Sequence, residues 1–361
     1  MNIKEQELIN VRKDEKINND SLKSYLSSHL DIKDQRLDIL QFGGGHANLT
    51  YLLKFENKEY VLRRPPIGPV APSAHDMYRE HKVQSSLNKL FPLAPNSLIF
   101  CEDETVIGAK FHIIERKNGF VIRKQMNDKF INSREKIRKL SFKMIDIISD
   151  LHKINPNDVG LADFGRPDGF VLRQLNGWED RWGKASDSKF TETRFKKLLS
   201  HLRSNIPQPQ AATILHNDFK LDNIMWNEDH PLMPVAVFDW DMCTRGDPLM
   251  DIGHMLNYWI EENDDDDCKF ITSMPTQNIM YPSRNEIINY YAEKSGFHIN
   301  DIDWYYAFGA FKLATILQQI YIRFLKGQTN DQRFSDFGKR IEALVNRANK
   351  VYGFNSNTNK G

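Results

Sequence analysis

The stretch ILHNDFKLDNIMWNEDHPLMPVAVFDWDMCTRGDPLMDIG, residues 214–253, carries more chemical information than any other part of this sequence. It contains two short runs, 223–226 and 234–239, that have the composition of strands. The residues between them include Asn, Asp and Pro, which favour turns, with Pro231 near the centre. The pattern therefore predicts a β-hairpin.

This hairpin would gather oxygen ligands at one of its ends. Antiparallel partners keep a constant sum of residue numbers, so a turn near the middle predicts that Met225 faces Val237 and that Asn223 faces Asp239. Asp218 lies five residues before Asn223, a spacing that lets a tight loop direct its carboxylate toward the same point. Carboxylate and amide oxygens are the ligands that Mg²⁺ prefers. The segment thus predicts a magnesium-bound phosphate site.

The same polar residues resemble the catalytic loop of protein kinases, which has a His, an Asp two residues later, an Asn five residues beyond, and then a metal-binding Asp. His216, Asp218, Asn223 and Asp239 fill these places. The segments LDNIM, FDWDM and GDPLMDIG are similar to the aminoglycoside phosphotransferase (kinase-like) family. Within that family they resemble the kinase domain of certain acyl-CoA dehydrogenase fusion proteins and related stand-alone bacterial proteins.

The resemblance implies an α+β, protein-kinase-like fold of two lobes, with a small antiparallel sheet in the N-lobe and mainly helices in the C-lobe. It also implies a role for each polar residue. Asp218 would orient the acceptor hydroxyl and accept its proton, while Asn223 and Asp239 would hold Mg²⁺. Asp241 would share a strand face with Asp239 and act as a second ligand or through water. Asp251 would bond to the backbone of the catalytic loop.

Periodicity along the chain agrees with this fold. We expect an N-terminal ATP-binding lobe over residues 1–115, a catalytic and substrate lobe over 116–354, and a disordered tail over 355–361. Ser21 is the expected cap of the first helix. The N-lobe elements are expected at 18–30 (helix), 37–45, 51–55 and 60–63 (strands), 73–90 (helix) and 106–114 (strand). The C-lobe helices are expected at 133–154, 171–182, 190–205, 248–262, 284–296, 303–325 and 334–352.

The glycine triplet at 43–45 is the expected turn over the phosphates of ATP. Gly44 and Gly45 would let backbone amides approach an anion closely. A flexible turn without a ligand would have the same sequence. The family commonly carries a Ser where Ala47 stands, which leaves Asn48 and Thr50 as candidates for a side-chain contact.

Three further positions are assigned to nucleotide binding. Strand alternation and the resemblance place Arg63 where kinases carry an ATP-binding Lys, with Glu80 as its partner. The competing interpretation is that Arg63 and its neighbour are simply solvated charges on a strand. Backbone groups from Glu115 to Lys117 would meet the adenine edge, although any apolar strand that leads into a polar crossover looks the same.

The acceptor side is less defined by the sequence. Arg173 is the candidate for an anionic acceptor, and Trp178 is a candidate substrate contact, although Trp at helical spacing is usually core. The acidic run at 261–267 would suit a polycationic aminoglycoside or form a solvated loop. The closest family branch instead implies hydroxyacyl-CoA-type substrates.

Composition sets outer limits on these interpretations. The chain has 361 residues, 40% hydrophobic and 27% charged, which is enough for two lobes with a core. A formal net charge of +1 gives no general reason to expect nucleic acid. The charged N-terminus and the lack of a long apolar run predict no signal peptide and no membrane partner. Three cysteines without metal-ligand or disulfide-framework spacing indicate reduced thiols and a cytoplasmic location. The oligomeric state is not indicated.

The expected function is therefore an ATP- and Mg²⁺-dependent transfer of the γ-phosphoryl group to a hydroxyl of a small molecule. Three alternatives stay open: an aminoglycoside kinase, a catalytically silent nucleotide-binding protein of the same fold, and a haloacid-dehalogenase-type phosphatase. The phosphatase would use the carboxylates of VAVFDWDMCT as its nucleophile. It would leave residues 216–223 unexplained.

Overall fold

The computed structural model describes residues 8–32, 36–43, 48–67, 76–123, 125–130, 133–185, 189–266, 268, 275, 280–329 and 331–354. The chain forms two compact units. Unit 1 comprises Met1–Phe120, Val159–Leu161 and Ile224–Cys243, and unit 2 comprises Val121–Asp158, Ala162–Asn223 and Thr244–Gly361. The chain thus passes between the units several times, and a division at residue 115 stays a prediction.

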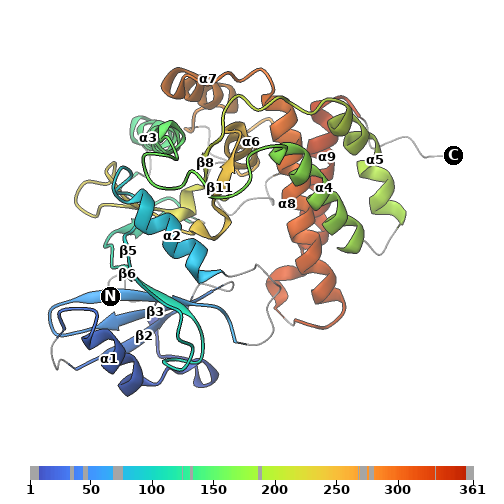
Figure 1. The fold of residues 1–361 in the computed structure, drawn as a ribbon. Coiled ribbons are helices and arrows are strands. Elements are labelled where there is room, and N and C mark those ends of the chain that lie inside the picture. Colours follow the sequence, from blue (N-terminus) through green and yellow to red (C-terminus); the bar gives the residue numbers. More distant parts are fainter. Residues whose placement is uncertain are drawn as a thin grey trace. The chain divides into compact units, whose positions relative to one another are not determined.

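Unit 1 is built on a six-stranded antiparallel sheet in the order β1-β2-β3-β4-β6-β5 (Figure 1). Its strands are β1 (Leu8–Ile9), β2 (Asp38–Phe42), β3 (Leu49–Lys54), β4 (Glu59–Arg64), β5 (Ser97–Cys101) and β6 (Phe111–Glu115). The register places Arg63 of β4 opposite Thr50 on one side and opposite His112 on the other. Arg63 is therefore held in the middle of the sheet, with a buried histidine on the neighbouring strand.

Two helices accompany this sheet, α1 (Asn19–Ser27) and α2 (Met77–Leu87). The cap of α1 differs from the prediction of Ser21, because Asn18 accepts a hydrogen bond from the backbone N–H of Ser21 at 3.0 Å. Leu22 and Leu26 of α1 join the core of the sheet. In α2, Asp76 caps the helix and leaves Glu80 in its first turn, pointing into the interior.

The strand predicted at 106–114 is wrong at its start. The chain turns at Gly108, which has a φ of 81°, and β6 begins only at Phe111. The short strands β1 and β5 were not predicted. Both lie at the edges of the sheet, where strands are short and their sequence pattern is weak.

The central hairpin forms, but its predicted register is wrong. Its strands are β9 (Ile224–Trp226) and β10 (Pro234–Val237), in a small sheet ordered β10-β9-β7, where β7 is Phe120–Val121. Met225 pairs with Ala236, one residue before the predicted Val237, and the register shifts between Pro234 and Ala236. The predicted pairing of Asn223 with Asp239 is not observed, because both residues lie outside the strands. A bulge of this kind changes the partner of every later residue.

Unit 2 is mainly helical. Its elements are α3 (Arg134–Lys153), α4 (Phe170–Ala185), α5 (Lys189–Ser204), β8 (Thr213–Leu215), η3 (Leu221–Asn223), β11 (Thr244–Gly246), α6 (Leu249–Leu256), α7 (Arg284–Ser295), α8 (Ile302–Leu325), η6 (Gln332–Phe334) and α9 (Phe337–Val351). Most follow the predicted ranges closely, because their capping signals are explicit. For example, Ser283 and Glu286 form a capping box at the start of α7, and Gly296 ends it with a φ of 77°.

Helix α8 is the centre of unit 2 and contacts both α6 and α9 (Figure 1). Two glycines allow the close approach of α6 and α8. A Cβ atom at Gly253 would lie 2.3 Å from the carbonyl carbon of Tyr305, and one at Gly309 would lie 2.7 Å from the carbonyl oxygen of Gly253. Helix α6 is shorter than the predicted 248–262 and ends at Leu256. This packing fixes the position of Asp251, which lies on α6.

The three cysteines are free and buried, as expected for structural thiols. Among the described residues, every helix is too short or too polar to cross a lipid bilayer. The predicted tail at 355–361 and most of the glycine turn, including Gly44 and Gly45, lie outside the described residues.

Candidate active site

Asp251 holds the backbone of the loop that follows β8. This buried carboxylate accepts hydrogen bonds from the backbone N–H of His216 at 2.7 Å and of Asn217 at 2.6 Å. His152 of α3 lies 3.1 Å from the same carboxylate and is hydrogen-bonded in turn to Tyr291 at 2.7 Å. Burial raises the pKa of Asp251, but His152 and the loop lower it, and the net pKa lies below its ordinary value. The predicted bond of Asp251 to the loop backbone is confirmed.

Asn217 takes the left-handed conformation, with a φ of 65°. Asn tolerates this region better than most side chains. The backbone N–H of Asp218 then reaches Nδ1 of His216 at 3.3 Å. His216 is fully buried and braces the turn. The loop therefore presents Asp218 from a fixed backbone.

The two carboxylate oxygens of Asp218 have different surroundings. Oδ2 lies 3.0 Å from Nζ of Lys220 and accepts a hydrogen bond from Nδ2 of Asn223 at 3.1 Å. Oδ1 receives no hydrogen bond from the described residues, and its nearest nitrogen partner is Nε2 of His254 at 4.0 Å. The side chain is 17% exposed. Two partners thus fix one oxygen, whereas the other accepts no hydrogen bond from the described residues.

Lys220 and His254 carry different charges beside this carboxylate. Burial lowers the pKa of Lys220, but Tyr258, Asp218 and Asp222 raise it, with a net rise above its ordinary value. Burial and the nearby charges of Lys312 and Lys220 lower the pKa of His254 well below its ordinary value. At neutral pH, Asp218 therefore has a cationic lysine on one oxygen and a neutral imidazole near the other.

The amide of Asn223 is oriented by Asp218. Its Nδ2 donates to the backbone carbonyl of Asp218 at 2.9 Å and to the carboxylate of the same residue. Its Oδ1 therefore points away from Asp218, and no described residue donates a hydrogen bond to it. An amide oxygen left in this way is a suitable ligand for a hard cation.

In unit 1, Arg63 forms the predicted pair with Glu80. Its Nε lies 3.0 Å from Oε1 of Glu80, and its Nη2 lies 3.6 Å from Oδ1 of Asp239. Burial raises the pKa of Glu80, but Arg63 and His112 lower it, and the net pKa lies below its ordinary value. Burial lowers the pKa of Arg63, but Glu80 and Asp239 raise it, and the net pKa lies above its ordinary value. The side chain of Arg63 is 16% exposed and lies beside two carboxylates, so it is a paired, largely buried charge and not a solvated strand residue, which argues against that competing interpretation.

A chain of polar side chains supports this pair. Nε2 of His112 lies 3.6 Å from Oε2 of Glu80, and Nδ1 of His112 shares a hydrogen bond of 2.9 Å with the hydroxyl of Ser97. The same hydroxyl lies 2.9 Å from Nδ1 of His81. Because His112 and Ser97 are buried, they fix the carboxylate of Glu80 on the side away from Arg63.

Asp239 follows β10 in the left-handed conformation, with a φ of 68°, and its side chain is 39% exposed. Asp241 lies in the 3₁₀ turn η4 (Trp240–Met242). The prediction that both residues share a strand face is therefore wrong, because the strand ends at Val237. Among the described residues, no cluster of three or more His, Cys, Asp or Glu side chains has the arrangement of a metal site. A magnesium site would need the amide of Asn223 and oxygens of the nucleotide.

The other nucleotide candidates have local partners. Asn48 is buried at the start of β3. The carboxylate of Glu115 accepts a hydrogen bond from the backbone N–H of Asn96 at 2.7 Å and lies 2.9 Å from Nζ of Lys117. The charges of Glu115 and Lys117 thus compensate each other. This is compatible with the predicted recognition of adenine by the backbone groups of this segment.

On α4, the two substrate candidates have different environments. The exposed Arg173 donates hydrogen bonds to the carbonyls of Arg166 and Asp168, at the loop that precedes the helix. Trp178 is 7% exposed. The guanidinium carbon of Arg181 lies 4.6 Å from its ring centroid, within the range of a cation–π contact.

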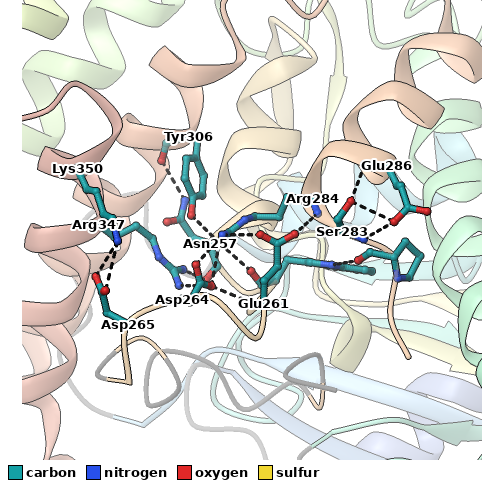
Figure 2. Close-up of polar contacts among 12 residues, drawn as sticks. Asn257, Glu261, Asp264, Asp265, Ser283, Arg284, Glu286, Tyr306, Arg347 and Lys350 are labelled. Carbon is teal, nitrogen blue, oxygen red and sulfur yellow. Dashed lines mark hydrogen bonds and ion pairs between the residues drawn. The ribbon is translucent and has the colours of Figure 1, made fainter. Parts of the chain in front are cut away.

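Two carboxylates of the acidic run, Glu261 and Asp264, are paired with arginines (Figure 2). Arg284 lies 2.7 Å from Glu261 and 2.6 Å from Asp264, and Arg347 lies 3.2 Å from Asp264. Burial raises the pKa of Asp264, but the two arginines lower it to below its ordinary value. These carboxylates act within the protein and hold the segment after α6 against the helices that follow.

The comparisons with known proteins agree with this geometry. The model of the phosphotransferase enzyme family matches residues 38–269, which is more than half of the chain. The chain belongs to this phosphotransferase family. It is 28% identical over 346 residues to acyl-CoA dehydrogenase family member 10 of Mus musculus, an alignment that covers 94% of this chain and 31% of that protein. The chain spans less than half the length of such relatives.

Solved structures give the fold of this phosphotransferase. A putative aminoglycoside phosphotransferase from Ralstonia eutropha superposes with a TM-score of 0.79 at 25% identity, covering 94% of this chain and 99% of the other. A mutant of aminoglycoside phosphotransferase APH(4)-Ia, solved with ADP and hygromycin B, gives a TM-score of 0.58 at 13% identity, with coverage of 94% and 100%. The α+β, protein-kinase-like fold is therefore confirmed.

Several residues of the phosphotransferase site were not predicted. Lys220 lies within the segment 214–253, but the kinase-like spacing of its polar residues gives Lys220 no role. His112 and His254 are separated from their partners by tens of residues. Lys312 lies farther still from the loop that it contacts. A single lysine within the apolar run FGAFKLATIL was the one signal available for it.

Proposed function

We propose that the chain is a small-molecule kinase that uses ATP and Mg²⁺ to phosphorylate a hydroxyl group. The asymmetric carboxylate of Asp218 carries this proposal. Lys220 and Asn223 fix its Oδ2, whereas its Oδ1 accepts no hydrogen bond from the described residues. A general base needs this combination of a fixed position and an oxygen that can receive a proton.

In the proposed reaction, Asp218 orients the acceptor hydroxyl through Oδ1. The bond between the γ-phosphorus and its bridging oxygen breaks, and a bond from the acceptor oxygen to the γ-phosphorus forms. The hydroxyl proton passes to the carboxylate of Asp218, and ADP leaves. Lys220 remains on Oδ2 and keeps the carboxylate from turning during the transfer.

For the nucleotide, we propose that Arg63 binds the phosphates while Glu80 holds its guanidinium in place. The Nη2 of Arg63 lies near Asp239, so one fork of the guanidinium is already directed away from Glu80. Gly44, Gly45 and Asn48 remain the proposed cover of the phosphates. The backbone between Glu115 and Lys117 remains the proposed contact for adenine. A protein of the same fold was solved with ADP, which supports the use of a nucleotide in general.

Asn223 and Asp239 are the proposed magnesium ligands, with Asp241 as a further ligand or a water-mediated one. Their oxygens are of the kind that Mg²⁺ prefers, and the amide of Asn223 has an available oxygen. When bound, Mg²⁺ would offset the negative charge of the phosphates.

For the acceptor, we propose an anionic metabolite of the hydroxyacyl-CoA type, with Arg173 and Trp178 on its binding surface. The cations Arg181 and Lys312 next to Trp178 favour a negative group. An aminoglycoside is polycationic, and the carboxylates that would suit it, Glu261 and Asp264, are paired with arginines (Figure 2). A small-molecule acceptor, a cytoplasmic location and the absence of nucleic-acid and membrane partners complete the proposal.

The test is a two-step measurement on the purified chain. Titration calorimetry with ATP, with and without Mg²⁺, should show metal-dependent binding. ADP formation should then be followed with a panel of hydroxyacyl-CoA thioesters, free hydroxy acids and aminoglycosides. Turnover with thioesters supports the proposal, and turnover with aminoglycosides alone contradicts the acceptor class. Tight ATP binding without any turnover would favour the catalytically silent protein.

A further inference from the structure

Helix α8 carries a buried charged side chain to which the phosphoryl-transfer step proposed above gives no role. Lys312 is 3% exposed and is surrounded along the helix by the buried Phe311 and Leu313. Its Nζ donates one hydrogen bond, to the backbone carbonyl of Asn217 at 3.1 Å. No carboxylate of the described residues forms an ion pair with it. Among the described residues, the buried ammonium group therefore has one hydrogen-bond acceptor, which is a neutral oxygen.

This arrangement is unfavourable for stability. Burial lowers the pKa of Lys312 to about 8. The charges of Asp218 and Asp251 raise this pKa, while those of Arg181 and Lys220 lower it further. A buried charge without a close counter-charge destabilises a fold relative to an apolar side chain of similar size. Packing alone thus gives no reason for a lysine at this position.

The bond from Lys312 acts on the peptide group that leads into Asp218. That group contains the carbonyl of Asn217 and the N–H of Asp218, and it is planar. The N–H of Asn217 is already held by Asp251. Lys312 holds the other side of the same residue from a different helix. The left-handed turn at Asn217 is therefore clamped from α6 and from α8, and the direction of the Asp218 side chain is set.

Lys312 also touches the proposed acceptor surface. Its Nζ lies 5.8 Å from the ring centroid of Trp178, and Arg181 lies over the same ring. The indole ring offers the ammonium a second, weaker partner. One buried cation thus contacts both the catalytic loop and the tryptophan of α4.

We propose that Lys312 is a positioning residue for phosphoryl transfer, whose ammonium group clamps the carbonyl of Asn217 and so aims the carboxylate of Asp218 at the acceptor hydroxyl. This inference rests on the proposed function. A positioning residue differs from a structural residue in one respect. Loss of Lys312 slows the reaction but does not weaken the fold.

The test compares Lys312→Met with Lys312→Gln and with the control Gln318→Met. Gln318 is a buried polar residue of the same helix, and it donates to the carbonyl of Ala185 at 3.0 Å, away from the loop. Met removes the donor at nearly constant volume, whereas Gln keeps an N–H donor. For Lys312→Met we expect kcat to fall about 100-fold, because a misplaced catalytic group has an effect of this size. The KM for ATP should not rise, and the urea midpoint of unfolding at pH 7.5 should not fall. Lys312→Gln should keep part of the kcat that Lys312→Met loses.

Amide hydrogen exchange supplies a readout that needs no acceptor. In Lys312→Met, exchange in the peptide that spans 214–221 should be about tenfold faster, and Gln318→Met should leave it unchanged. Unchanged exchange or unchanged kcat in Lys312→Met overturns the inference. A lower urea midpoint together with loss of kcat in both Met variants also overturns it, since that result describes a structural residue. Absence of turnover in the wild type refutes the proposed function, while the exchange experiment still decides on the clamp.

Discussion

The buried charges of unit 1 and those of unit 2 are arranged in opposite ways. In unit 1, the guanidinium of Arg63 lies between two carboxylates, and Glu80 is further supported by His112. In unit 2, the ammonium of Lys312 lies against a backbone carbonyl. The first arrangement compensates its charges within the protein, and the second leaves a cation only partly compensated. We infer that the first group holds a preformed phosphate-binding cation, whereas the second supports a loop at the cost of stability.

The largest expected effect concerns the base in unit 2. Replacing Asp218 by Asn should lower kcat about 1,000-fold, because the amide keeps the shape but does not accept the hydroxyl proton. ATP affinity, measured by titration calorimetry, should stay near that of the wild type. Asp222→Asn is the matched control, since Asp222 lies 4.0 Å from the same Lys220 but does not contact Asp218. Full activity in Asp218→Asn would exclude it as the base.

The ion pair of unit 1 should show the next largest effect. Arg63→Met leaves Glu80 buried without its partner, which should cost about 3 kcal/mol of unfolding free energy. It should also weaken ATP binding. The double variant Arg63→Met with Glu80→Met should recover most of the stability, measured by urea unfolding, but none of the ATP affinity. Recovery of ATP binding in the double variant would show that Arg63 does not bind the phosphates.

The pH dependence of stability tests the cation of unit 2. The pKa of Lys312 is lowered from 10.5 to about 8, so between these values the unfolded chain binds more protons than the folded one. The contribution of this group to the free energy of unfolding therefore rises with pH in this window. The full destabilisation by the buried ammonium group is present below pH 8. Lys312→Met should be the more stable protein at pH 7.5, and its advantage should shrink by about 2 kcal/mol at pH 9.5. Urea unfolding of both proteins at the two pH values gives the difference, and a constant advantage would show that Lys312 is not a strained cation.

The smallest effect is expected on the exposed acceptor surface. Arg173→Ala should raise the KM of an anionic acceptor about fivefold, since an exposed ion pair contributes about 1 kcal/mol. Arg203→Ala on α5 is the control, because Arg203 is also exposed and already contacts Asn176 and Glu179. Steady-state kinetics with the best thioester would check this. An equal effect of both variants would indicate a general charge effect and not a binding contact.

The sequence was sufficient for the fold because its signals are local. The spacing of His216, Asp218 and Asn223 and the caps of the helices are properties of neighbouring residues. The register of β9 and β10 was not predictable in the same way, because a bulge near Pro234 depends on how the hairpin packs. The left-handed conformation of Asp239 likewise ended the strand earlier than alternation suggested.

The partners of the site show the same limit. The Arg63–Glu80 pair could be predicted because the fold resemblance gives both positions. His112 and Lys312 act on residues to which no local pattern connects them. Their roles depend on the final packing of strands and helices. Lone polar residues in apolar runs are the one trace that such contacts leave in a sequence.

The contact of Arg347 with the end of α6 has a consequence for synthesis. Nη1 of Arg347 donates to the carbonyl of Asn257, the C-cap of the helix that carries Asp251, at 2.8 Å. During translation, Asp251 leaves the ribosome well before Arg347 does, and helices form far faster than the chain is made. A chain truncated before α9 would therefore contain the whole motif at 214–253 and yet lack this bond at the end of α6.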